Sequence, residues 1–184
     1  MSDADHLIRR SIPTDPSDRE SKSPFFAELE RQGMTPSREM QFVGTEPATV
    51  AVAAGLNLSV GDSVIARRKI LFADGVPVRI ATSYFSNEQF GDSGLDVGDF
   101  IMPTLQSALK AAGHVFGRAN ETLRARPVTE VESTQLECDV SEWVVEILRT
   151  SFDKSDTPIH LLQTVCLASR HVFDIVQPEG RDAF

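Results

Sequence analysis

The chain has 184 residues, of which 41% are hydrophobic and 24% are charged, the composition of a folded domain with a core of its own. Eighteen basic residues face 27 acidic ones, so the formal net charge is −9. A domain that grips a phosphate backbone is usually basic, so this charge argues against DNA or RNA binding by this chain alone.

The first ordered element is predicted to begin near Ser23. Residues 1–22 are rich in Ser, Asp, Pro and Arg and show no hydrophobic period, which is typical of a flexible arm or linker. Ser23 can cap a helix whose first turn accommodates Pro24. Residues 179–184 are polar and predict a frayed tail, so we expect the folded domain over residues 23–178.

Between these ends the pattern predicts an α+β fold built from antiparallel hairpins and helices. Asp74-Gly75 between two β-rich runs is a strong hairpin signal, and Thr129 and Glu132 have the spacing of a capping box. After the helix at Ser23, the predicted elements are a helix over 48–54 ended by Gly55, strands over 64–72 and 77–85, a loop over 87–99, a helix over 103–112, a short strand over 121–126, a helix opened at Thr129, and strands over 143–152, 158–167 and 170–176.

Two stretches of the chain resemble each other. Residues 45–84 and 129–165 each run through a capped helix, a strand, a tight turn, a proline and a second strand. Any two helix–hairpin units share this outline; the alternative is a duplicated unit whose hairpins join one sheet about a pseudo-twofold axis, leaving a cleft there. A shift of 81 residues superposes Val64 on Val145, Arg68 on Arg149, Pro77 on Pro158 and Ser83 on Thr164.

Strand alternation sorts side chains onto one face of such a sheet. This face collects basic and hydroxyl groups among small apolar ones, and is either a ligand pocket or a solvated surface. The first hairpin contributes Arg79, Ala81, Ser83 and Phe85, with Arg67, Lys69 and Leu71 alternating on the neighbouring strand, and the second contributes His160, Leu162, Thr164 and Cys166.

The candidate ligand contacts follow from this face. They are Lys69, Arg79, Ser83, Arg124, Arg149, His160 and Thr164. His160 either contacts a ligand or is an ordinary sheet residue. Arg149 either holds a ligand anion or forms a buried ion pair with Asp153 or Glu132, and we favour the ion pair.

The sequence holds no motif of a familiar catalytic site. Gly-x-Ser-x-Gly, His-Glu-x-x-His, the P-loop and Gly-x-Gly-x-x-Gly are all missing, and two cysteines, Cys138 and Cys166, are too few for a zinc site or a disulfide framework. We expect no metal, no cofactor and no enzymatic activity. The polar N-terminal residues do not resemble a signal peptide and no apolar run matches a membrane span, so we expect a cytoplasmic protein that does not bind membranes.

Several motifs, taken in order, resemble UTRA domains, the effector-binding halves of the HutC-like subfamily of GntR transcriptional regulators. The resemblance covers about residues 24–178 and implies a chorismate-lyase-like fold, a sheet with helices packed on it, a homodimer and a small-metabolite ligand. The motifs are Gly61-Asp62-Ser63-Val64, Arg67-Arg68-Lys69, Ala73-Asp74-Gly75-Val76-Pro77, Ser83-Tyr84-Phe85, Arg126-Pro127-x-Thr129-x-x-Glu132, Leu148-Arg149-Thr150-x-x-Asp153 and Ser169-Arg170-His171.

Two departures from the family matter. Family members carry an N-terminal winged helix, and no helix-turn-helix pattern precedes Ser23 here, so we expect no direct DNA binding. Relatives that bind phosphorylated amino sugars resemble one another in using two arginines, which match Lys69 and Leu71, and glutamates, which match Ala81 and His160. We therefore expect a ligand with one anionic or polar end and an apolar body rather than a sugar phosphate.

The resemblance thus implies a small-molecule sensor domain that signals through a dimer. An alternative is a stand-alone dimerisation module that modulates related regulators, with residues 165–176 as its weakly charged apolar edge. A chorismate-lyase-like enzyme is a third possibility, but no poised carboxylate accompanies the cations Lys69, Arg79 and Arg124.

Overall fold

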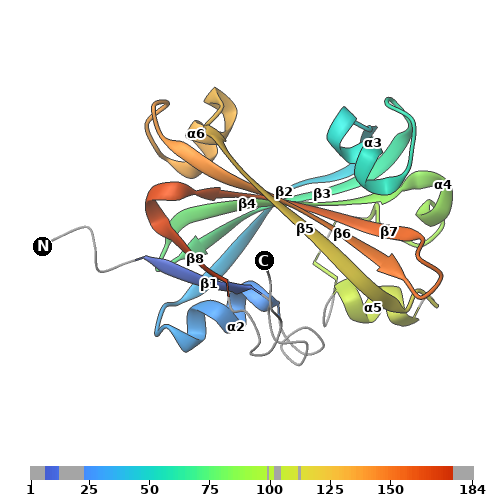
Figure 1. Ribbon diagram of the computed structural model, residues 1–184, viewed down its shortest axis with the longest axis horizontal. Coiled ribbons are helices and arrows are strands. Elements are labelled where there is room, and N and C mark those ends of the chain that lie inside the picture. Colours follow the sequence, from blue (N-terminus) through green and yellow to red (C-terminus); the bar gives the residue numbers. More distant parts are fainter. Residues whose placement is uncertain (1–6, 13–22, 99, 102–104, 112, 176–184) are drawn as a thin grey trace, which may run out of the picture.

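A computed structural model describes residues 7–12, 23–98, 100–101, 105–111 and 113–175. Its centre is a six-stranded antiparallel sheet with the strand order β2-β3-β4-β7-β6-β5, flanked by a two-stranded parallel sheet, β1-β8 (Figure 1). The α+β fold is therefore as expected. The strands are β1 (Ile8–Ile12), β2 (Pro36–Pro47), β3 (Ser63–Ala73), β4 (Val76–Ser86), β5 (Phe116–Pro127), β6 (Trp143–Asp153), β7 (Pro158–Leu167) and β8 (His171–Ile175).

Short helices cover both faces of the large sheet. Helices α3 and α6 pack on one face, and α2, α4 and α5 pack on the other (Figure 1). Alternation produces the two cores, since Ile70 and Ile80 pack with α6 while Leu71 and Ala81 pack with α2. The helices are α2 (Pro24–Arg31), α3 (Val50–Leu56), α4 (Asn87–Phe90), α5 (Leu105–Ala111), α6 (Glu130–Leu136) and the 3-10 turn η2 (Ala168–Arg170).

The ends of the helices follow local chemistry. The capping box of α6 is confirmed: the hydroxyl of Thr129 accepts the Glu132 N–H at 3.3 Å, and the Glu132 carboxylate accepts the Thr129 N–H at 3.0 Å. We expected Gly55 to end α3, but the helix ends at Asn57, which adopts the left-handed conformation at φ +56°. Gly55 lies inside the helix. A glycine suits this position because a Cβ there would come within 2.9 Å of the Leu161 side chain.

Four parts of the strand, loop and edge prediction were wrong. Strand β2 was not predicted, since its sequence has few β-branched residues and it relies on pairing with β3. Strand β5 spans 12 residues instead of six, and residues 87–90 form a helix in the expected loop. The expected apolar edge over 165–176 begins in β7, where Val165, Cys166 and Leu167 are buried in the centre of the sheet.

Strand β1 lies inside the segment where we expected a flexible arm. Ile8 is buried with Phe25 and Leu29 of α2. The side-chain amide of Gln32 accepts the Arg9 N–H at 2.8 Å and donates to the Arg9 carbonyl at 2.9 Å. The partner strand, β8, is at the other end of the chain, so no local pattern could indicate the pairing. The remainder of the expected arm and the expected tail lie outside the described residues.

The internal repeat is a true duplication, with an offset that changes along it. The units β2-α3-β3 and β5-α6-β6 are 80 residues apart, and Asn57 and Glu137 end their helices in the same left-handed conformation. Val64 pairs with Ser86 and Val144 pairs with Leu167, so the offset becomes 81 after the hairpin turn. The second turn is one residue longer.

This change of offset corrects part of the predicted superposition. Ser83 does match Thr164, as expected, because both follow the turn. Before the turn, Arg68 matches Leu148, and the residue equivalent to Arg149 is Lys69.

Candidate ligand-binding pocket

The sheet face opposite α3 and α6 forms the floor of a cavity of about 310 Å³. The N-terminal part of α2, residues Phe100 and Ile101, and strands β2 and β5 form its walls. Of the two alternatives for this face, the structure therefore favours a pocket over a solvated surface. Its floor consists of Arg67, Lys69, Leu71, Arg79, Ala81, Ser83, Arg149, Ser151, His160, Leu162 and Thr164.

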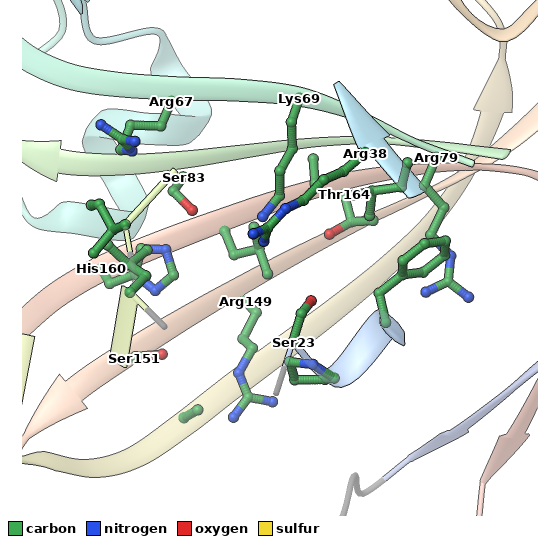
Figure 2. Close-up of a pocket in the computed structure, with 18 of the residues that line it drawn as sticks. Ser23, Arg38, Arg67, Lys69, Arg79, Ser83, Arg149, Ser151, His160 and Thr164 are labelled. Carbon is green, nitrogen blue, oxygen red and sulfur yellow. The ribbon is translucent and has the colours of Figure 1, made fainter. Parts of the chain in front are cut away.

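Ser83 and Thr164 lie together at the centre of this floor. Ser83 pairs with Leu162 and Ala81 pairs with Thr164 across the β4–β7 junction. Both hydroxyl-bearing residues line the cavity (Figure 2). Strand alternation and the duplication therefore predicted their common face correctly.

Lys69 is a cation that lines the cavity. It points into the cavity from β3, and Arg38 reaches the same space from β2 (Figure 2). Among the described residues, Lys69 forms no ion pair. Burial lowers the pKa of Lys69 to about 8, and the neighbouring charges of Arg38 and Arg67 lower it as well.

Arg38 is held by aromatic rings. Its guanidinium lies 4.1 Å from the ring centroid of Phe100 and 5.4 Å from that of Phe26. Such stacking positions the cation while leaving its edge available for hydrogen bonds. Arg38 and Lys69 together make the β2–β3 side of the cavity electropositive.

Arg79 lines the cavity but is fully engaged in a buried network. It donates to the carboxylate of Glu28 in α2, and its Nε donates to Nε2 of His171 at 2.7 Å. Burial lowers the pKa of His171 to about 3, so the neutral ring accepts from Arg79, and its Nδ1 donates to the Leu167 carbonyl at 2.8 Å. Arg79 thus joins β4 to α2 and β8.

Arg149 forms an ion pair, as we favoured, but with another partner. Its Nη1 lies 3.4 Å from Oε1 of Glu121 on β5. Neither expected carboxylate is available, because Glu132 is bound by Arg126 through two bonds of 2.7 Å and Asp153 accepts backbone N–H groups of its turn. The predicted strand over 121–126 included Glu121, but its pairing with β6, which places Glu121 opposite Arg149, was not predicted.

His160 presents an unsatisfied ring nitrogen. Its ring stacks on Phe85, with centroids 4.8 Å apart and planes 13° apart. Burial, together with the charges of Arg149 and Lys69, lowers its pKa to about 3, so the ring is neutral. Its Nε2 is buried and has no hydrogen-bond partner among the described residues.

Arg124 does not belong to the site, and that expectation was wrong. Arg124 is exposed on β5, where it lies opposite Glu146 in the strand register. It is three residues along the strand from Glu121, which lines the pocket. An odd separation along a strand places two side chains on opposite faces.

Sequence reasoning missed other lining residues because their strands, or in the case of β5 its length and pairing, were not predicted. These are Arg10 on β1, Arg38 and Met40 on β2, and Glu121 on β5. The duplication offered one signal, since Arg38 lies 80 residues before Arg118, which also lines the cavity.

Over the described ranges, no group of three or more His, Cys, Asp or Glu side chains could hold a metal ion. None of the helices in that part of the chain has the length and apolar character needed to cross a membrane.

Comparison with known proteins places the fold. The chain is 23% identical over 151 residues to YurK, an uncharacterised HTH-type transcriptional regulator of Bacillus subtilis, and this covers 82% of the chain but only 62% of YurK. PhnF from Mycobacterium smegmatis superposes with a TM-score of 0.77 at 20% identity, over 95% of this chain and 73% of PhnF. The PhnF effector domain alone gives 0.75 at 21% identity, over 93% of this chain and 99% of that domain.

These superpositions confirm the expected fold of a sheet with helices packed on it. The UTRA domain family pattern matches residues 31–172, which is most of the sequence. The chain therefore belongs to the UTRA domain family.

Proposed function

We propose that this chain is a small-molecule sensor domain of a transcriptional regulator and that it binds an organic anion. The observation that supports this most strongly is Lys69, a cation in a cavity with no counter-charge among the described residues. An ammonium removed from water without a partner is costly, and a ligand anion would relieve that cost. Membership of the UTRA domain family and the similarity to the effector domain of PhnF support the sensor role.

The pocket offers a place for each part of such a ligand. Lys69 and Arg38 would hold the anionic group. The apolar body would lie on Ala81 and Leu162 at the centre of the floor, where Ser83 and Thr164 add hydroxyl groups. The unsatisfied Nε2 of His160 would bind a neutral polar group.

The arrangement supports binding rather than catalysis. The two carboxylates among the described lining residues, Glu28 and Glu121, are both ion-paired, to Arg79 and to Arg10 and Arg149. Because guanidinium groups occupy their oxygens, neither carboxylate is placed to exchange a proton with a bound molecule.

We further propose that the domain signals as a homodimer and does not bind DNA by itself. The net charge of −9 supports the second statement. Sedimentation at micromolar concentration should give about twice the monomer mass, and a monomer there would refute the first.

The function can be tested by calorimetric titration with straight-chain monocarboxylates, which have one anionic end and an apolar body. Lys69→Met should weaken binding by about tenfold or more, and the matched variant Lys154→Met, at an exposed turn position, should retain it. Failure of the unmodified chain to bind any small organic anion would contradict the proposal.

A further inference from the structure

The cavity wall includes a residue that lies outside the UTRA match. Arg10, on β1, lines the cavity, whereas the match begins at residue 31. Its side chain is only 13% exposed, and its Nη1 is buried without a hydrogen-bond partner in the described part of the chain. A buried guanidinium N–H without an acceptor is rare, because the lost hydrogen bonds to water are not replaced.

The charge around Arg10 is also unbalanced. Its Nη2 donates to Oε1 of Glu121 at 2.6 Å, and Nη1 of Arg149 lies 3.4 Å from the same oxygen. One carboxylate therefore serves two guanidinium groups, which leaves one positive charge without a carboxylate partner among the described residues. This surplus belongs to the β5–β6 side of the cavity, across the floor from Lys69 and Arg38.

The position of Arg10 is fixed by the fold. Two residues before Arg10, Ile8 is buried and lies opposite His171 in the β1–β8 register. His171 accepts a hydrogen bond from Arg79. Gln32 binds both backbone polar groups of Arg9. The strand is thus attached to the elements that build the pocket wall, and Arg10 is its one residue that lines the cavity.

We infer that Arg10 is a ligand contact and that the ligand is an organic dianion. One anionic group would be held by Lys69 and Arg38, and the second would accept from the free Nη1 of Arg10, beside Arg149. This inference rests on the proposed function and adds to it a second anionic group on the ligand and a contact from strand β1. Ligand binding then holds β1 against β8, so occupancy of the pocket sets how firmly the N-terminal strand is docked.

Two series of probes test this inference by calorimetry: α,ω-dicarboxylates from malonate to suberate, and the monocarboxylates of equal length. At least one dicarboxylate should bind the full chain about tenfold or more tightly than its monocarboxylate, because a charge-assisted hydrogen bond is added. This advantage should disappear in Arg10→Gln. It should persist in Arg9→Gln, the adjacent arginine, whose side chain is 63% exposed.

Arg10→Lys separates a ligand contact from a structural role. A lysine keeps a cation for Glu121 but has only one nitrogen, so the dicarboxylate advantage should fall even where the strand stays docked. Hydrogen exchange of residues 8–12 should slow when the tightest dicarboxylate is bound, and should not slow with the monocarboxylate.

The outcomes are distinct. If monocarboxylates bind through Lys69 but no dicarboxylate gains, or if the gain survives in Arg10→Gln and Arg10→Lys, the inference is wrong and the proposed function stands. If neither series binds, the proposed function fails as well.

Discussion

Lys69 and Arg149 occupy equivalent positions in the two halves of the duplicated sheet, but within the described part of the chain only Arg149 has a carboxylate partner. Both point into the same cavity from the strands next to the central pair (Figure 2). The two halves differ in the same way one strand outward. Arg118 on β5 forms an ion pair with Asp156 at 2.6 Å, whereas its counterpart Arg38 on β2 contacts aromatic rings. The duplication thus produced a symmetric set of cations that is neutralised on one side more than on the other.

The first prediction concerns Lys69→Met. Anion affinity should fall by about tenfold or more, while the unliganded protein should be as stable as the unmodified chain or more stable, because an uncompensated cation has been removed. Chemical denaturation measures the second quantity. A large loss of stability would show that Lys69 has a structural partner.

The stability difference between Lys69→Met and the unmodified chain should depend on pH with a definite sign. The pKa of Lys69 is about 8 in the folded state, below its ordinary value, so between pH 8 and about 10 the unfolded chain binds more protons. The stability contributed by this group therefore rises with pH in that window. The stability advantage of Lys69→Met over the unmodified chain should shrink as pH increases from 7 to 10.

Ligand affinity should depend on pH in the opposite direction. A bound anion favours the ammonium form of Lys69, so affinity should be constant between pH 6 and 7.5 and decline above pH 8. Lys69→Arg should remove this decline, because arginine stays charged throughout the range. A decline that is identical in both proteins would assign the titration to another group.

Glu28→Gln should destabilise the fold. It leaves the buried Arg79 without its counter-ion, which typically costs about 3 kcal/mol or more. Arg118→Gln breaks an exposed ion pair instead and should change stability little. Equal effects in urea denaturation would contradict the structural role of the Arg79 network.

The equivalent helix ends permit a test of the duplication. Glu137 adopts φ +49° and Asn57 adopts φ +56°, a conformation that glycine tolerates best and asparagine better than most. Glu137→Gly should therefore stabilise the protein by about 1 kcal/mol, and Asn57→Gly should have a smaller effect. Thermal unfolding of the two variants would show whether this order holds.

The sequence allowed the central hairpins, their common face and the duplication to be predicted, since all three depend on local alternation and turn signals. The residues that complete the pocket were beyond such reasoning. Arg38 and Arg10 lie on strands that are defined by pairing with distant segments. The equivalence of Lys69 and Arg149 was also missed, because a single offset of 81 residues was applied to the whole repeat. The offset is 80 before the hairpin turn, and the second hairpin has one extra residue in that turn.

Lys69 has no anionic partner among the residues that the structure describes, and we propose that a ligand anion supplies one. The most direct test is an NMR titration of isotopically labelled lysine side chains, with Lys69 assigned by comparison with Lys69→Arg. The account predicts a pKa of about 8 for Lys69 in the free protein and a clear increase when the tightest carboxylate is bound. A free-state pKa at the ordinary lysine value, or one that does not move on addition of any carboxylate, would contradict it.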